Sequence, residues 1–521
     1  MRNYKILWAD DEIDLLKPHI LFLNNKGYEV EPVISGSDAL EALQTDDYDI
    51  IFLDENMPGI TGLETLAEIK STHPNIPVVM ITKSEEEYIM EEAIGAKIAD
   101  YLIKPLNPNQ ILLSVKKILD NKRLVSQKTN MGYQQEFRNI SMELSDHLDY
   151  NEWIEIYKKM VYWELEIDET EEKDMAEIFH MQKDEANSAF SDFVVENYES
   201  WVNNPKADRP MLSNQVMKKE VFPLLDEGKP TFFFLIDNLR YDQWELIEPV
   251  ISDFFTVEKE VPFYSILPTT TAYARNSIFG GMMPDEMANS HSDIWVDEDQ
   301  DEGKNMHEEE FLKRNLKRNN LNKTVSYHKV LQKQQGRQLV ANVNNLYQYD
   351  LNAIVYNFVD VLSHARTDMK MIRELAPDES AYRSLTMSWF NHSTLFELLK
   401  ILSEKDVNVV LTTDHGTIRV NKPFKIVGDK NTNTNLRYKV GKNLNVGKGD
   451  AVYVSRKPES LHLPKPNVSS SYVFATKNDF FAYPNNFNYY VNFYKDTFQH
   501  GGISMEEMII PLIHLKPKSK K

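Results

Sequence analysis

The sequence predicts a multidomain α/β protein: a doubly wound α/β domain first, a helical-bundle connector second, and a larger α/β domain with a β-rich cap insertion third. Three observations lead to this prediction. Short apolar runs ending on a polar group recur in residues 1–120 and again after residue 226. Between them, residues 133–227 contain no glycine, which favours uninterrupted helices. The length of 521 residues suits about three domains.

Composition excludes several classes of protein and site. The chain has no cysteine, so disulfides and thiolate metal sites are excluded, and any zinc must be bound by His, Asp or Glu. We find no apolar run of about 18 residues and no signal-peptide pattern, so we expect a cytoplasmic protein. The net charge of −22 argues against general affinity for the DNA backbone.

In the first domain, residues 1–120, four apolar runs predict the strands of a parallel sheet, because helical patterns separate them. The runs are Lys5–Ala9, Asp49–Leu53, Pro77–Ile81 and Asp100–Ile103. They end on Asp10-Asp11, Asp54, Thr82 and Lys104-Pro105. The carboxyl ends of such strands lie at one edge, where three carboxylates favour Mg²⁺ and a lysine with a hydroxyl suits a phosphoryl group.

This domain resembles the receiver domain of two-component response regulators over its whole length. The resemblance implies that Asp54 is the phosphoacceptor and that Asp10, Asp11 and the backbone of Asn56 hold Mg²⁺ with it. It also implies that Thr82 and Tyr101 are the switch residues that respond to the phosphoryl group, and that Lys104 contacts this group. A cis peptide bond is expected before Pro105.

Residues 121–225 are expected to form the connector bundle, after a helix that closes the first domain at Asp120. Trp153, Ile156, Tyr157, Met160 and Val161 recur with helical spacing and predict one buried face. Residues 141–200 carry 18 acidic and 4 basic side chains. We interpret the run from Glu164 to Asp174 as a solvated helix or turn, with a docking surface for a basic partner as the alternative.

In residues 226–521 the polar strand ends have the chemistry of metal ligands. Apolar runs at 231–236, 353–358 and 407–412 predict central parallel strands, and Met508–Ile513 predicts a further strand that Pro511 places at an edge or bulge. The polar residues that follow these runs, or lie in later loops, are Asp237, Thr271, Asp360, His364, Asp414, His415 and His500. Together they suit two divalent ions about 4 Å apart, with zinc the best fit and manganese also compatible.

The order of these residues resembles the alkaline phosphatase superfamily, and specifically its PglZ-type domain. The resemblance implies that Thr271 is the nucleophile, that Asp237, Asp414 and His415 hold one zinc, and that Asp360, His364 and His500 hold the second. Relatives that cleave nucleotide phosphodiesters commonly have asparagine where this chain has Ala274. Arg275 and Asn276 are therefore the candidates for contacting the substrate.

With the receiver in front, the whole chain is similar to the response regulators of type IX secretion. This resemblance implies hydrolysis of nucleotide or oligonucleotide phosphodiesters. It also implies a PorY-like sensor histidine kinase and an extracytoplasmic-function sigma factor as partners, and a phosphorylation-linked homodimer. Two functions remain open, a di-zinc phosphodiesterase controlled by phosphorylation and a non-catalytic adaptor that binds a sigma factor or a secretion component.

Residues 419–480 are expected to form the cap, because Arg437–Val440 and Ala451–Ser455 have short strand patterns. Residues 419–457 carry 10 basic and 2 acidic side chains. This charge either attracts a phosphate backbone, with Tyr438 or Tyr472 stacking on a base, or simply solubilises an exposed loop.

Overall fold

The computed structural model describes residues 4–74, 76–83, 98–170, 173–297, 303–428, 432–446, 452–465, 467 and 469–518. The chain divides into two compact units, residues 1–134 and 135–521. Both units combine helices with β-sheets, which confirms the predicted multidomain α/β fold class. The sheet of the first unit is parallel, and the second unit has a mixed central sheet and small, mainly antiparallel sheets.

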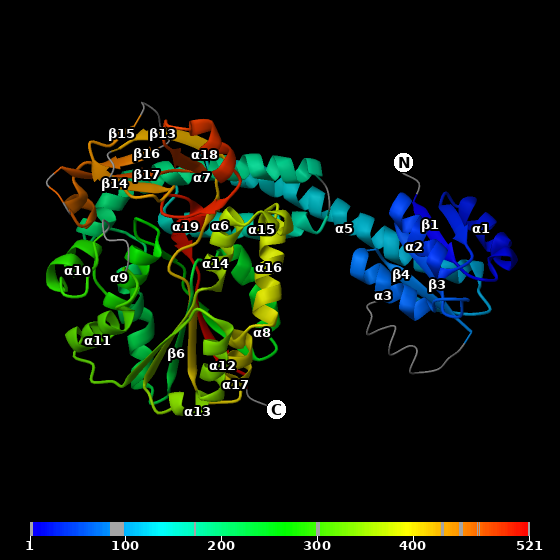
Figure 1. Cartoon of the computed structure of the whole chain (residues 1–521), viewed down its shortest axis with the longest axis horizontal. Helices are drawn as coiled ribbons and strands as arrows, with labels where there is room; N and C mark the ends of the chain where they lie inside the picture. Colours follow the sequence, from blue (N-terminus) through cyan, green and yellow to red (C-terminus); the bar gives the residue numbers. More distant parts are fainter. Residues whose placement is uncertain are drawn as a thin grey trace. The chain divides into compact units, whose positions relative to one another are not determined.

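The first unit is a doubly wound sheet of five parallel strands in the order β2-β1-β3-β4-β5 (Figure 1). The strands are β1 (Lys5–Ala9), β2 (Glu29–Val33), β3 (Ile50–Asp54), β4 (Val78–Thr82) and β5 (Asp100–Ile103). The helices are α1 (Lys17–Asn24), α2 (Gly36–Thr45), α3 (Gly62–Thr72) and α5 (Pro108–Glu143), with a 3₁₀ turn at Ile13–Leu16.

The two faces of this sheet have separate apolar cores because successive strand residues point to opposite sides. Leu7, Ile51 and Met80 pack against α2 and α3, whereas Ile6, Phe52 and Val79 pack against α1 and α5. The helix predicted to end at Asp120 instead continues unbroken to Glu143. No proline occurs between residues 109 and 143, so nothing in the sequence forces the helix to stop.

The connector helices are α6 (Tyr150–Asp168) and α7 (Lys173–Asn203). Helix α6 begins at a capping box formed by Asp149 and Glu152, and all five residues of its predicted apolar face are buried. The prediction that the acidic run is solvated is wrong for Glu164. This side chain is buried and paired with Lys183 and Arg383, at 2.8 and 3.0 Å.

The larger unit is built on a six-stranded sheet in the order β7-β21-β11-β6-β10-β9. The strands are β6 (Thr231–Ile236), β7 (Phe255–Glu260), β9 (Val325–Val330), β10 (Leu351–Tyr356), β11 (Asn408–Thr412) and β21 (Leu512–Pro517). Strands β11, β6, β10 and β9 are parallel. The edge position predicted for Met508–Ile513 is wrong. Pro511 separates the short strand β20 (Ile509–Ile510) from β21, and β21 lies inside the sheet between β11 and β7.

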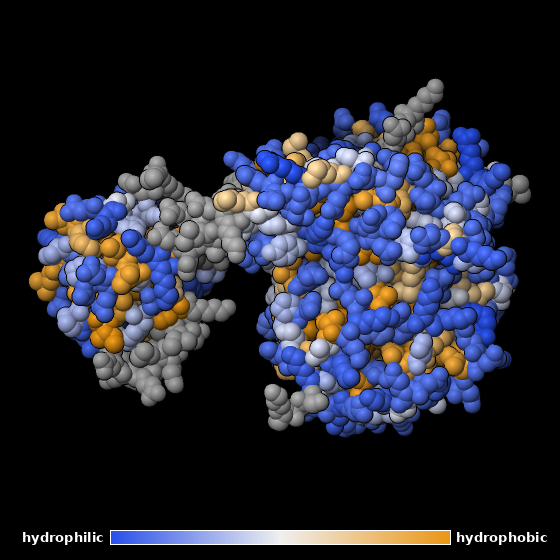
Figure 2. Space-filling model, turned by 180° about the vertical axis from the view of Figure 1, so that it is seen from behind, coloured by the Kyte–Doolittle hydropathy of each residue, from blue (hydrophilic) through white to orange (hydrophobic). Residues whose placement is uncertain are grey.

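Helices cover both faces of this sheet, with α9 and α11 on one side and α8, α12, α16 and α17 on the other (Figure 1). The bounds on the first side are α9 (Asn276–Gly280), α10 (Pro284–Ser290) and α11 (Glu308–Arg318). On the second side they are α8 (Tyr241–Ile251), α12 (Lys333–Ala341), α13 (Val343–Leu346), α16 (Glu379–Asn391) and α17 (Thr394–Leu402). The view from behind shows a mainly hydrophilic surface on this unit with separate apolar patches (Figure 2). The apolar strands are therefore interior.

The remaining elements surround the carboxyl ends of the central strands. Helices α14 (Phe358–Asp368) and α15 (Lys370–Leu375) follow β10. The cap consists of small sheets, in the orders β15-β13-β18 and β14-β17-β16. Its strands are β13 (Lys422–Val427), β14 (Tyr438–Lys442), β15 (Asn445–Val446), β16 (Val452–Ser455), β17 (Ser470–Ala475) and β18 (Asp479–Ala482). Helix α18 (Phe487–Tyr494), strand β19 (Phe498–Gln499), which pairs with β12 (Ile418–Arg419), and helix α19 (Met505–Met508) lead back to the sheet.

No helix in the described part of the chain combines the length and apolarity needed to cross a membrane.

Candidate functional site

At the carboxyl edge of the first sheet, Asp10, Asp11 and Asp54 bring carboxylate oxygens within 4.8 Å of one another. Lys104 Nζ lies 2.8 Å from Asp10 and 2.9 Å from Asp54. Burial raises the pKa of Asp54, and Asp10 adds to this effect although Lys104 opposes it. Three oxygen donors beside one ammonium group leave excess negative charge, which suits a hard divalent cation.

The other residues predicted for this site lie around the same edge. Thr82 ends β4 and is buried, Tyr101 lies in β5, and Asn56 is exposed in the loop after β3. The peptide bond between Lys104 and Pro105 is cis, which confirms that prediction.

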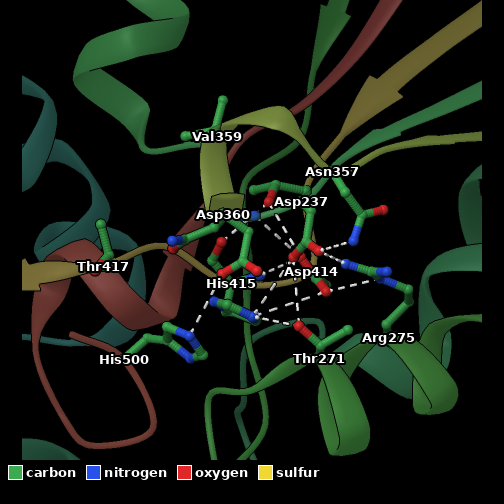
Figure 3. Close-up of polar contacts among 12 residues, drawn as sticks. Asp237, Thr271, Arg275, Asn357, Val359, Asp360, Asp414, His415, Thr417 and His500 are labelled. Carbon is green, nitrogen blue, oxygen red and sulfur yellow. Dashed lines mark hydrogen bonds and ion pairs between the residues drawn. The ribbon is translucent and has the colours of Figure 1, made fainter. Parts of the chain in front are cut away.

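The larger unit has a second cluster at the end of its central strands. Strands β11, β6 and β10 are adjacent and parallel, so the residues that follow them meet at one edge (Figure 3). Asp237 follows β6, and Asp414 with His415 follows β11. Their candidate ligand atoms lie within 4.8 Å of one another, and all three side chains are buried. We call these three residues the inner trio.

A further cluster lies beside the inner trio and consists of Asp360, His364 and His500, the outer trio. Asp360 and His364 are one turn apart on α14, which places both on one helix face. The Nε2 atoms of His364 and His500 lie 3.5 and 3.6 Å from Asp360 Oδ1. The His415 and His500 rings stack with centroids 4.3 Å apart, so the two trios are directly adjacent.

Thr271 lies at the inner trio. Its Oγ1 is 3.2 Å from His415 Nε2 and 3.4 Å from Asp237 Oδ1 (Figure 3). The side chain follows the loop Leu267–Thr270, which connects β8 (Phe263–Tyr264) to a helical turn at Thr271–Arg275. A hydroxyl beside a carboxylate and an imidazole is suited to act as a nucleophile.

His415, which is buried, and His500, which is half-buried, are oriented as metal ligands usually are. His415 Nδ1 faces the Gly416 carbonyl oxygen at 3.1 Å, and His500 Nδ1 faces the Thr269 carbonyl oxygen at 3.2 Å. A carbonyl only accepts, so each Nδ1 carries the proton and each Nε2 presents a lone pair to the site. Burial, with His415 and His364 nearby, lowers the pKa of His500 and keeps its ring neutral.

Asp360 Oδ1 is buried without a hydrogen-bond partner among the described residues.

These features fit a pair of metal ions. The donors are carboxylate oxygens and neutral imidazole nitrogens, which is the set expected for zinc in a chain without cysteine. Each trio offers three protein ligands, and three ligands leave an open position in tetrahedral geometry.

Arg275, one of the two predicted substrate contacts, is fully buried and points at the inner trio (Figure 3). Its guanidinium pairs with Asp237 and, at 2.9 Å, with Asp414. Burial raises the pKa of Asp237. It opposes ionisation of Asp414 as well, but Arg275 and His415 hold that pKa low. Asn276, the other candidate, donates its amide to the carbonyls of Ala272 and Lys304, at 2.8 and 3.0 Å.

One residue of the site was missed from the sequence. Asn357 follows β10, and its Nδ2 donates to Asp237 Oδ2 at 2.7 Å (Figure 3). The available signal was its position at the end of an apolar strand, the same signal that identified Asp237 and Asp414. An amide is a weaker indication of metal chemistry than a carboxylate, so the residue did not stand out.

The predicted stacking of bases on Tyr438 or Tyr472 is wrong, because both rings are buried. Tyr472 donates its hydroxyl to the Pro464 carbonyl at 3.0 Å, and Tyr438 packs edge-on against Tyr273. Neither face is open to a ligand. The basic residues of the cap therefore have no aromatic platform at these two positions.

Family models match three consecutive parts of the chain. A response regulator receiver domain matches residues 6–116, a PorX response regulator linker domain matches residues 123–202, and a BREX system PglZ alkaline phosphatase-like domain matches residues 216–515. In this order the three matches give a PorX-type architecture.

Individual relatives match the first part of the chain. The alkaline phosphatase synthesis transcriptional regulatory protein PhoP of Bacillus subtilis is 29% identical over 131 residues, covering 25% of this chain and 54% of PhoP. The CpxR homolog of Haemophilus influenzae is 33% identical over 130 residues, covering 25% and 55%. This chain thus spans about half the length of these curated relatives. A CheY-like receiver domain from Methanospirillum hungatei JF-1 is 25% identical, covering 23% of this chain and 96% of its own, with a TM-score of 0.23.

Proposed function

Because this chain belongs to the PglZ alkaline phosphatase-like family and carries a response regulator receiver domain, we propose that it is a phosphorylation-controlled, di-zinc phosphodiesterase. The observation that carries the proposal is the position of Thr271, whose Oγ1 lies 3.2 Å from His415 and 3.4 Å from Asp237. The outer trio is adjacent to it. The proposed substrates are nucleotide or oligonucleotide phosphodiesters.

The residues have distinct roles in this proposal. Asp237, Asp414 and His415 would hold one zinc, and Asp360, His364 and His500 the second. When bound, such a pair activates the attacking oxygen and stabilises charge on the leaving oxygen. Thr271 Oγ1 attacks phosphorus, the bond to the leaving alcohol breaks, and water then releases the phosphate monoester from Thr271. Asn357 holds Asp237 in place through its 2.7 Å hydrogen bond.

The test is hydrolysis of bis(p-nitrophenyl) phosphate by the zinc-loaded protein, with p-nitrophenyl phosphate measured alongside to compare monoesters. Thr271→Val should lower kcat/KM at least about a thousandfold, a loss of about 4 kcal/mol of transition-state stabilisation. The control is Thr270→Val, the neighbouring buried threonine, whose hydroxyl has no hydrogen-bond partner among the described residues. It should retain activity within about fivefold. Equal rates for wild type and Thr271→Val would exclude catalysis by this site.

Arg275 favours a second candidate function, the non-catalytic adaptor. Its guanidinium already compensates part of the charge of Asp237 and Asp414, as a metal ion would. In this case the purified protein contains no zinc at the inner trio, and its output is binding to a sigma factor or secretion component. Elemental analysis after zinc loading separates the two functions, because the phosphodiesterase requires about two zinc ions per chain.

A receiver domain implies a cognate histidine kinase and phosphorylation-linked regulation. We propose more specifically that a PorY-like sensor histidine kinase phosphorylates Asp54 with Mg²⁺ held by Asp10, Asp11 and Asn56, and that Thr82, Tyr101 and Lys104 respond. The phosphorylated chain would form a homodimer, bind an extracytoplasmic-function sigma factor and control type IX secretion. The match to the PorX linker domain supports this assignment.

Substitution of the phosphoacceptor tests the coupling. With acetyl phosphate and Mg²⁺, wild type should incorporate phosphate and change its sedimentation coefficient and hydrolysis rate. Asp54→Asn should show none of these changes while retaining the unphosphorylated rate. Asp46→Asn, which alters an exposed carboxylate paired with Lys5, should respond like wild type. An unchanged response in Asp54→Asn would show that the receiver does not act through this residue.

A further inference from the structure

Helix α7 of the connector contacts the loop that carries His500. The segment of residues 500–507, a loop that runs into the first turn of α19, is called the His500 loop. Asn187 of α7 makes two buried hydrogen bonds to it. Its Nδ2 donates to Glu506 Oε2 at 3.0 Å, and its Oδ1 accepts from the Met505 backbone N–H at 2.9 Å. The Asn187 amide therefore fixes both a side chain and the backbone of the loop.

Two more residues of α7 extend this contact along the loop. Lys183, one turn before Asn187, pairs with Glu506 Oε1 at 3.1 Å. Ser191, one turn after it, places its hydroxyl 3.3 Å from the Ile503 carbonyl and 2.7 Å from the carbonyl of Asn187, and so bridges the helix and the loop. These positions share one face of α7 because they are spaced by four residues. A continuous strip of the connector helix thus holds residues 503–506.

The other side of the loop faces the outer trio. His500 Nδ1 donates to the Thr269 carbonyl, the Gly501 N–H donates to Thr269 Oγ1 at 3.0 Å, and Thr269 Oγ1 donates to the Gly502 carbonyl at 2.9 Å. The orientation of the His500 ring therefore depends on the backbone of the loop. His364 and Asp360 belong to α14 instead and do not depend on it.

The His500 loop has little room to move between these contacts. A Cβ atom on Gly502 would lie 2.4 Å from the Ala475 carbonyl oxygen, closer than any side chain tolerates. Glu507 accepts the Gly502 N–H at 2.9 Å and pairs with buried Arg437 at 2.6 Å. Because close-packed segments transmit displacements, a shift of residues 503–506 would move His500 as well.

We propose that Asn187 is a positioning residue for the outer metal subsite, and that α7 sets the affinity of this subsite through the His500 loop. The inference rests on the proposed function, since it assumes that the outer trio binds a metal ion. In this proposal the connector influences metal binding. A change in the position of α7 would move residues 505 and 506 through their hydrogen bonds to Asn187, and these residues belong to the same segment as His500. The residues of the inner trio follow β6 and β11 directly. Their strand end meets the same segment at Gly416, whose N–H donates to the Glu507 carbonyl at 3.3 Å, one residue beyond those that Asn187 holds.

The experiment is a titration of the metal-free full-length chain with Zn²⁺ by calorimetry at pH 7. Asn187→Leu, which has a similar volume and loses both hydrogen bonds, should weaken the second zinc-binding event about ten- to hundredfold and leave the first within about twofold. His500→Ala identifies the second event by removing it. The matched control is Asn197→Leu on the same helix, because the contact described for the Asn197 amide is with the Phe193 carbonyl of its own helix. It should bind both ions like wild type.

A double substitution separates positioning from a general loss of stability. In the His500→Ala background, Asn187→Leu should have no further effect on zinc binding, because the ligand it positions is absent. If Asn187→Leu does not fold, Ser191→Ala replaces it and should weaken the second event in the same way, by about threefold to tenfold.

Two results would overturn the proposal. One is a second zinc-binding event unchanged in a folded Asn187→Leu protein. The other is an equal weakening of both events together with a lower Tm of the metal-free protein, which would mean that Asn187 only stabilises the fold. Both results are independent of hydrolysis. A protein that binds two ions but does not cleave phosphodiesters would reject the proposed function and leave this inference standing.

Discussion

Three clusters of closely spaced carboxylates in the described part of the chain differ in how their charge is compensated. In the receiver, three carboxylates share one Lys104. At the inner trio, Asp237 and Asp414 share Arg275 and have His415 beside them. The third cluster, between the connector and the larger sheet, has Glu164, Asp242 and Glu379 in contact with three cations. These cations are Lys183, Arg240 and Arg383.

The difference indicates which clusters are suited to metal ions. The receiver and the inner trio each retain excess negative charge, and a divalent cation relieves it. In the third cluster each of the three carboxylates already pairs with a cation, although Lys183 also pairs with Glu506 and Arg383 with Asp168. The cluster has no imidazole, and a metal ion would compete with three bound cations. Carboxylates close together in space are therefore insufficient evidence for a metal site. The charge of the surrounding side chains decides whether a cluster of carboxylates is suited to a metal ion.

Among the substitutions that test this comparison, replacing Arg275 should change the free energy of unfolding most. In the presence of a chelator, Arg275→Met should lower the free energy of unfolding by about 5 kcal/mol, because it leaves Asp237 and Asp414 buried without a cation. Saturating Zn²⁺ should recover most of this loss, since the ion replaces the missing charge. Urea unfolding with and without Zn²⁺ measures both values. A loss of the same size in both conditions would mean that the inner trio does not bind zinc.

The third cluster should behave differently. Glu164→Gln should lower the free energy of unfolding by about 3 kcal/mol at pH 7, and Zn²⁺ should not recover it. Burial alone would raise the pKa of Glu164, but Lys183, Arg383 and Arg240 hold it well below the ordinary value of 4.5. The ionised form therefore stabilises the fold above about pH 4.5, and its contribution fades as the pH falls below that value.

Urea unfolding of wild type and Glu164→Gln from pH 8 to pH 3.5 measures this dependence. The difference between the two proteins should stay constant from pH 8 to pH 5 and shrink at lower pH. Glu166→Gln on the same helix is the matched control, because that side chain is only half-buried and has no ion pair among the described contacts. A difference that is constant down to pH 3.5 would show that Glu164 is not stabilised as an anion.

The sequence predicted Asp54, Asp237 and Asp414 because each ends or follows an apolar strand, and parallel strands bring their ends together. His500 lies in a later loop and was assigned from the resemblance. It did not predict what surrounds them. Arg275 stands next to Ala274 in the chain, but its place between Asp237 and Asp414 depends on how the turn after Thr271 packs. Local patterns also suggested that Glu164 is solvated. Its partner Arg383 is 219 residues away, a separation that periodicity does not reveal.

Replacing Asn357 should cause the smallest change in zinc affinity at the inner trio, because this uncharged side chain only donates a hydrogen bond to Asp237. Asn357→Ala removes the 2.7 Å hydrogen bond to Asp237 Oδ2 and should weaken the first zinc-binding event about tenfold, or about 1.4 kcal/mol. The second event should stay unchanged, because Asp237 is not part of the outer trio. This pattern is the reverse of that expected for Asn187→Leu.

The matched control for this prediction is Asn408→Ala at the opposite end of the sheet. Asn408 begins β11, and its amide donates to Glu227 at 3.1 Å, far along the strand from Asp414. It should bind both ions like wild type in the same calorimetric titration. If Asn357→Ala also binds the first ion normally, then Asp237 is held by Arg275 and the backbone alone. If it weakens both ions equally, the two trios act as one unit, and the separation between an inner and an outer subsite has to be abandoned.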